Sequence, residues 1–145
     1  MDYYYNILIT GCSSGLGEAL FNKVWEHDFL KPFGHYRTED GDPYALIGDI
    51  TDPDFPEKLD NYIREREIDC FINNAGVYEG DIIDTNLGSQ IRMLQVVYKY
   101  FLEREKGRII NINSVAGLYP SANESIYCAS KFGLKGFSKS IQLEA

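Results

Sequence analysis

The chain has 145 residues, of which 44% are hydrophobic and 25% charged, so we expect one packed globular domain over 1–145. Its net charge of −8 argues against a nucleic-acid partner or an anionic membrane surface, since both require a basic face. The N-terminal residues show no signal peptide or membrane span, which predicts a cytoplasmic protein. Cys12, Cys70 and Cys128 are odd in number and lack metal-site spacing, so we expect free thiols and no metal.

The first half of the chain alternates short apolar segments with helical patterns. In chain order, the patterns predict a strand over 4–10, a helix over 16–28, strands over 33–37 and 44–48, and a helix over 54–66. The first helix would carry its apolar side chains on one side: Leu16, Ala19, Leu20, Val24 and Phe29. Residues 38–43 read as a turn because they are rich in glycine, proline and acidic residues.

The second half continues the same alternation. The patterns predict a strand over 68–72, a helix over 87–105, a strand over 108–113 and a helix over 125–145. Nearly continuous apolar strands separated by helices are typical of a parallel sheet that is covered on both faces. The sequence therefore predicts an α/β fold, a Rossmann-like doubly wound parallel sheet of about five strands in a single domain, with its ligand crevice beyond the carboxyl ends of the strands.

A glycine-rich run, TGCSSGLG at 10–17, follows the first predicted strand and opens the first helix. Gly11 permits a tight turn with positive φ, Gly15 lets the backbone approach a pyrophosphate, and Gly17 lets the helix pack against the strand. The helix N-terminus offers free N–H groups to phosphates, and Ser13 and Ser14 add hydroxyl donors. The alternative is an ordinary strand-to-helix turn, although the position at the first strand–helix junction favours a dinucleotide site.

Tyr127 and Lys131 are four residues apart in the last predicted helix, so they lie on one face. An isolated tyrosine titrates near pH 10 and is a poor acid or base at neutrality. A nearby ammonium stabilises the phenolate, so Lys131 can make Tyr127 a usable general acid or base. The alternative is an unrelated surface pair, because this spacing is common by chance.

Two further polar residues stand close to strand ends. Ser114 follows the fifth strand and can hydrogen-bond a substrate carbonyl oxygen against the Tyr127 hydroxyl. Asn86 opens the long helix, where its amide can hold a water near Lys131 and extend a proton path. Asparagine is also a favoured helix N-cap, and the two interpretations of Asn86 remain open.

Taken in order, TGCSSGLG at 10–17, NNAG at 73–76, Ser114 and YCASK at 127–131 resemble the classical short-chain dehydrogenase/reductase family. GDITD at 48–52 is also similar to that family. The resemblance implies that Asp49 contacts the adenine, with Ile50 beside it, and that the run from Asn73 to Gly76 stabilises the central strand. The implied cofactor site comprises Gly11, Ser13, Ser14, Gly15, Leu16, Gly17, Arg37, Asp49, Ile50, Asn74, Ala75, Gly76, Tyr127 and Lys131.

The resemblance also implies a reaction: hydride transfer between a nicotinamide and a small-molecule carbonyl or alcohol. In this scheme Tyr127 donates or accepts the proton, Lys131 assists it and binds the ribose, Ser114 orients the substrate and Asn86 completes the set. A homo-oligomer formed through the long helices is implied as well. The family continues into further strands and a substrate loop, so the alternatives are a catalytically incomplete dinucleotide-binding or interaction module, or an unstable fragment.

The residues at the end of the second predicted strand bear on cofactor choice. An acidic residue there favours NAD(H), whereas Arg37 can pair with a 2′-phosphate, with Thr38 and Ser13 as hydroxyl donors. We therefore expect NADP(H) to be favoured over NAD(H). The alternative is an arginine that Glu39 or Asp40 neutralises in solvent.

Overall fold

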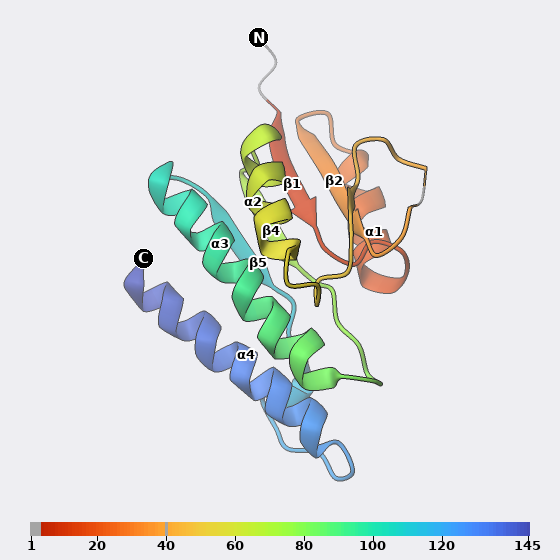
Figure 1. Ribbon diagram of the computed structural model, residues 1–145, viewed down its shortest axis with the longest axis vertical. Helices are drawn as coiled ribbons and strands as arrows, with labels where there is room; N and C mark the ends of the chain where they lie inside the picture. The colour runs from red at the N-terminus through yellow and green to blue at the C-terminus, as the bar shows by residue number, and fades with distance from the viewer. Residues whose placement is uncertain (1–3, 40) are drawn as a thin grey trace.

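A parallel sheet forms the centre of the fold, which a computed structural model describes over residues 4–39 and 41–145 (Figure 1). The strands and helices of the described residues are β1 (Tyr5–Ile9), α1 (Gly15–Trp25), β2 (Leu30–Tyr36), β3 (Leu46–Ile47), α2 (Phe55–Glu65), β4 (Cys70–Asn73), α3 (Ser89–Glu103), β5 (Arg108–Asn111) and α4 (Ser125–Glu144). A π-helical turn, Asp84–Gly88, precedes α3, and a 3-10 turn, Val115–Gly117, follows β5. The predicted α/β class and the predicted alternation of strands and helices are confirmed.

The strand order is β3-β2-β1-β4-β5, and every neighbouring pair is parallel. The chain winds outward from β1 to β3, then returns past β1 to build β4 and β5 on its other side. The direction of winding therefore reverses between β1 and β4. In open α/β sheets a ligand crevice forms at such a reversal, beyond the carboxyl ends of the strands.

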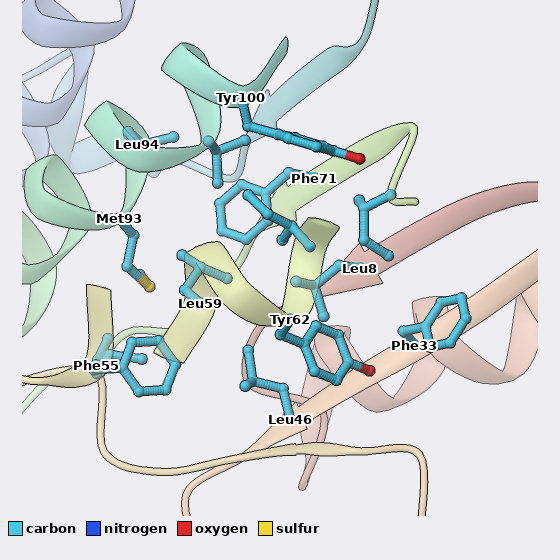
Figure 2. Packing of buried hydrophobic residues seen from close by; sticks show 14 of the residues in the cluster. Leu8, Phe33, Leu46, Phe55, Leu59, Tyr62, Phe71, Met93, Leu94 and Tyr100 are labelled. Atoms are coloured by element: carbon cyan, nitrogen blue, oxygen red, sulfur yellow. The ribbon is translucent and has the colours of Figure 1, made fainter. Parts of the chain in front are cut away.

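Alternate side chains of β1, β2 and β4 enter two separate cores. Leu8 of β1 and Phe71 of β4 pack against α2 and α3 in the larger core, which Figure 2 shows from close by. Their neighbours Ile9 and Ile72 belong to a smaller core under α1. Because successive side chains in a strand point to opposite faces, this division follows directly from the strand sequence.

Several predicted boundaries are wrong, including those of β2, α1, β3 and β5. β2 begins at Leu30 rather than residue 33 and includes Pro32, and Arg37 lies just after it. Proline is tolerated there because β3 pairs only with His35 and Tyr36, which leaves Pro32 in a part of β2 that has β1 alone as a neighbour.

The first helix is also shorter than predicted. α1 ends at Trp25, so Phe29, expected on its apolar face, lies outside it and is exposed. Leu16 and Ala19, expected on the same face, are exposed too, whereas Leu20 and Val24 pack on the sheet as expected, together with Phe21. The turn predicted over 38–43 carries no helix or strand in its described residues, and Asp40 lies outside the described residues.

Candidate functional site

The glycine-rich turn between β1 and α1 has the geometry that its three glycines predict. Gly11 adopts φ of 73°, in the left-handed region that favours glycine. A Cβ atom on Gly17 would lie 2.0 Å from the Gly11 carbonyl oxygen, whereas one on Gly15 would meet no heavy atom within 4 Å. Gly17 thus lets α1 start directly against the turn, and Gly15 faces open space.

The N-terminus of α1 lies at this turn. Ser14 is the N-cap residue, with extended backbone and no side-chain hydrogen bond to the cap. Ser13 and Ser14 are both exposed. The N–H groups of the first helical turn and the partial positive charge of the helix end favour an anion here, and two serine hydroxyls are available to it.

Thr10, to which the sequence analysis gave no role, locks this turn to the end of β4. The buried Thr10 hydroxyl accepts hydrogen bonds from the backbone N–H groups of Asn74 (2.9 Å) and Ala75 (3.0 Å). In return, the Asn74 side chain donates to the carbonyl oxygens of Thr10 (2.9 Å) and Gly11 (3.3 Å). These bonds hold two loops, 63 to 65 residues apart in sequence, in a fixed relation at the winding reversal.

A cleft with a volume of about 1090 Å³ lies beyond the ends of β1, β2, β3 and β4. Of the predicted cofactor residues, the cleft is lined by Gly11, Ser13, Ser14, Arg37, Asp49, Ile50, Asn74, Ala75 and Gly76. Five others do not line it: Gly15, Leu16, Gly17, Tyr127 and Lys131. Gly17 is buried, while Leu16 is 52% exposed.

The far end of the cleft combines a carboxylate with an arginine. Asp49 accepts hydrogen bonds from the Thr51 N–H (2.9 Å) and hydroxyl (2.8 Å). These bonds lower the pKa of Asp49, with a smaller contribution from the positive charge of Arg37. Arg37 and Thr38 are exposed and line the same end, so the expected hydroxyl and guanidinium donors do face one space.

Tyr127 and Lys131 lie on one face of α4, as predicted. The Lys131 ammonium is 5.6 Å from the centroid of the Tyr127 ring and only 7% of the residue is exposed. Burial lowers the pKa of Lys131, because a charged ammonium loses hydration there. A partly buried tyrosine beside a buried ammonium is unlike the unrelated surface pair that the spacing alone allowed.

Asn86 lies next to this pair but does not cap a helix. It is buried in the π-helical turn, where its amide exchanges two hydrogen bonds with the Val77 backbone, at 2.6 and 2.7 Å. The N-cap interpretation is therefore wrong. A Cβ atom built on Gly76 would lie 3.2 Å from Asn86 Oδ1 and 3.8 Å from Lys131 Nζ, so the three residues meet at one point.

Ser114 lies three residues beyond β5, because β5 ends at Asn111 rather than at residue 113 as predicted. Its hydroxyl accepts a hydrogen bond from the Ala116 N–H (3.1 Å) and so begins the 3-10 turn. Asn113 connects this segment to α4, because its side chain donates to the Lys131 carbonyl oxygen (3.1 Å). The structure thus brings the Ser114 segment to α4 through a residue that the sequence analysis did not single out.

Tyr78 is a second residue that sequence reasoning missed. Its ring lies 4.9 Å from the Tyr127 ring, and its hydroxyl donates to the Glu124 carboxylate. Tyr78 belongs to the short connection between β4 and α3, whereas Glu124 directly precedes α4. No local pattern could have indicated the contact, because it depends on how the connection after β4 lies against the start of α4.

Comparisons with known proteins agree with this architecture. The 3-oxoacyl-(acyl-carrier-protein) reductase FabG of Salmonella typhimurium is 33% identical over 161 residues, which cover 94% of this chain and 66% of that protein. FabG of Escherichia coli strain K12 is 32% identical with the same coverage. The chain therefore spans about two thirds of the length of these relatives.

Two solved structures share this fold. An actinorhodin polyketide ketoreductase variant with NADPH superposes with a TM-score of 0.82 at 27% identity, over 97% of this chain and 65% of that one. The aldohexose dehydrogenase of Thermoplasma acidophilum superposes with a TM-score of 0.85 at 25% identity, over 99% of this chain and 62% of that one.

Within the described ranges, no helix combines the length and the apolar character needed to cross a bilayer. The family model described as short chain dehydrogenase matches residues 5–145, nearly the entire chain. The chain therefore belongs to the short-chain dehydrogenase family.

Proposed function

We propose that residues 1–145 form the dinucleotide-binding unit of an NAD(P)-dependent oxidoreductase that acts on a small-molecule carbonyl or alcohol. The observation that carries the proposal is the buried Lys131 ammonium over the Tyr127 ring, at the same sheet edge as the cleft. When bound, a nicotinamide dinucleotide supplies or accepts the hydride.

The residues of the cleft fit such a group. The α1 N-terminus with Ser13 and Ser14 would hold the pyrophosphate, because free N–H groups and hydroxyls converge there. Gly15 leaves room for the phosphates, since a Cβ atom there would meet nothing within 4 Å. Asp49 and Ile50 would contact the adenine at the end of the cleft beside β3.

Proton transfer is the role of Tyr127 and Lys131. In the reductive direction the carbonyl carbon gains a hydride and the carbonyl oxygen gains a proton, which the Tyr127 hydroxyl donates. The Lys131 ammonium stabilises the phenolate that remains, and Ser114 would hold the carbonyl oxygen in place. Asn86 would hold a water beside Lys131, and a proton from this water would restore the Tyr127 hydroxyl. The amide can bind that water because its oxygen accepts only one hydrogen bond from Val77 and its nitrogen donates only one, which leaves one lone pair and one N–H free.

Relatives narrow the substrates worth screening. They include an acyl-carrier-protein reductase, a polyketide ketoreductase and an aldohexose dehydrogenase, so 3-oxoacyl thioesters, polyketide-like ketones and aldoses form the first panel. Cytoplasmic localisation and homo-oligomer formation through α3 and α4 are parts of the same proposal. Leu102 on α3 and Leu143 on α4 are exposed apolar side chains, and they support the homo-oligomer.

A fluorescence titration of the 145-residue chain with NADPH and NADH tests the proposal. We expect saturable binding of both, followed by turnover of at least one compound of the panel. Absence of binding at any pH would overturn the proposal.

A specific observation favours a second candidate, a module that binds the dinucleotide without turnover. Tyr127, Lys131 and Ser114 do not line the cleft in this chain. Binding without turnover of any compound would support this candidate over the oxidoreductase.

We propose NADP(H) as the preferred form, since Arg37 and Thr38 line the end of the cleft and a relative of known structure holds NADPH. Arg37→Ala should weaken NADPH binding about tenfold to a hundredfold, because a hydrogen bond to a charged group contributes about 1.5–3 kcal/mol. NADH, which lacks the 2′-phosphate, should lose less than about threefold. Arg108→Ala, at the exposed start of β5, is the matched control for lost charge. Equal losses for both cofactors in Arg37→Ala would contradict the preference.

A further inference from the structure

A histidine lies buried beneath the cleft in β2, and the proposed reaction gives it no role. His35 is 3% exposed and lines the floor of the cleft. Its ring packs edge-on against Phe55 of α2, with centroids 5.2 Å apart. Buried polar side chains need hydrogen-bond partners, so the partners of the ring show what it does.

The two ring nitrogens bind two different loops of the cleft. Nδ1 lies 3.2 Å from the backbone N–H of Gly11, and Nε2 lies 2.8 Å from the carbonyl oxygen of Gly48. A backbone N–H can only donate and a carbonyl can only accept. Nδ1 must therefore accept and Nε2 must carry the hydrogen, which fixes the neutral ring in one tautomer.

Protonation of the ring is incompatible with this arrangement. A protonated imidazole has two donors and no acceptor, so its Nδ1–H would face the Gly11 N–H and the bond would be lost. Burial lowers the pKa of His35, and so does the positive charge of Lys58 on α2, whereas the Gly48 carbonyl and the Asp49 carboxylate raise it. Burial has the largest effect, so the ring is neutral at neutral pH.

We propose that His35 is a positioning residue for the cofactor: in its neutral form it joins the phosphate-binding turn at Gly11 to the end of β3 at Gly48, and its protonation weakens dinucleotide binding. The inference rests on the proposed function, because it assumes that this cleft takes a dinucleotide. Gly11 precedes the N-terminus of α1, and Gly48 precedes Asp49, so the ring fixes the distance between the pyrophosphate end and the adenine end.

The pH profile of NAD⁺ binding tests this inference. NAD⁺ is the matched ligand because it lacks a 2′-phosphate, which would itself titrate near pH 6. The dissociation constant of the wild-type chain should be constant above the ionisation of His35 and rise by up to about tenfold per pH unit below it. Thermal melting at each pH checks that the chain remains folded throughout the range.

Substitutions separate the positioning role from a merely structural one. His35→Asn retains an acceptor near the Nδ1 position but cannot be protonated, so it should bind NAD⁺ with a flat pH profile. His35→Leu removes both bonds and should bind more weakly at every pH. His27→Asn is the control, because His27 is the only other histidine and is exposed, and it should retain the wild-type profile.

The His27→Asn variant also gives a direct readout, since His35 is then its single histidine. Proton NMR should show that saturating NAD⁺ moves the midpoint of His35 ionisation to lower pH, as reciprocal linkage requires. Binding with an unmoved midpoint, or an unchanged pH profile in His35→Asn, would overturn the inference and leave the proposed function standing. Absence of both NAD⁺ and NADPH binding by the wild-type chain at pH values where His35 is neutral would overturn the proposed function, and the inference with it.

Discussion

Tyr127→Phe should remove nearly all turnover while cofactor binding remains. The substitution removes only the hydroxyl that donates the proton, and loss of general acid catalysis costs about 10²- to 10⁴-fold in rate. The phenyl ring can keep its contact with the Tyr78 ring, 4.9 Å away, and its place under the Lys131 ammonium. We therefore expect a fall of that size in kcat, with dissociation constants for NADPH within about twofold of wild type.

The measurement is steady-state turnover of the best compound of the screen, combined with the fluorescence titration. Tyr4→Phe is the matched control, because Tyr4 is also partly exposed and lies before β1, at the opposite end of the sheet. Its kcat should equal that of wild type. Turnover that persists in Tyr127→Phe would show that another group moves the proton, and Tyr78 would then be the first residue to examine.

Much of the fold could be predicted from the sequence because it depends on local patterns. The alternation of strands and helices, and the glycines at the first strand–helix turn, are readable from periodicity and residue type. The start of β2 was not readable, since Pro32 is acceptable only where β3 does not pair with it. The length of a neighbouring strand decided this boundary, and the sequence of β2 carries no sign of it.

The candidate site divides in the same way. Tyr127 and Lys131 could be placed together from their spacing in one helix, whereas the partners of Asn86 could not be predicted. Asn86 and Val77 are nine residues apart in an irregular connection, and their pairing depends on how β4 passes into the π-helical turn. His35 is the extreme case, because its two partners come from separate loops, and only the order of the strands brings them to one ring.

Gly17→Ala should destabilise the chain and remove cofactor binding together. A Cβ atom there would lie 2.0 Å from the Gly11 carbonyl oxygen and 2.6 Å from the Asn74 side-chain nitrogen. Backbone must therefore move, and the bonds that join Asn74 to Thr10 and Gly11 would be strained. Overpacking of this kind costs about 1–3 kcal/mol, and we expect the upper end of that range in urea denaturation.

Gly136 and Gly15 are controls that separate the clash at Gly17 from a general effect of replacing glycine by alanine. Gly136 lies in α4, where a Cβ atom would meet nothing within 4 Å, so Gly136→Ala should stabilise the chain by up to about 1 kcal/mol.

Gly15 also faces open space but has φ of 61°, so Gly15→Ala should cost about 1–2 kcal/mol of stability. Its main effect should be weaker cofactor binding, because the added methyl group would lie where phosphates are expected. A Gly17→Ala chain as stable as wild type would mean that the turn can relax away from Gly17. In that case, close packing of α1 against the turn would not be what holds the cleft in shape.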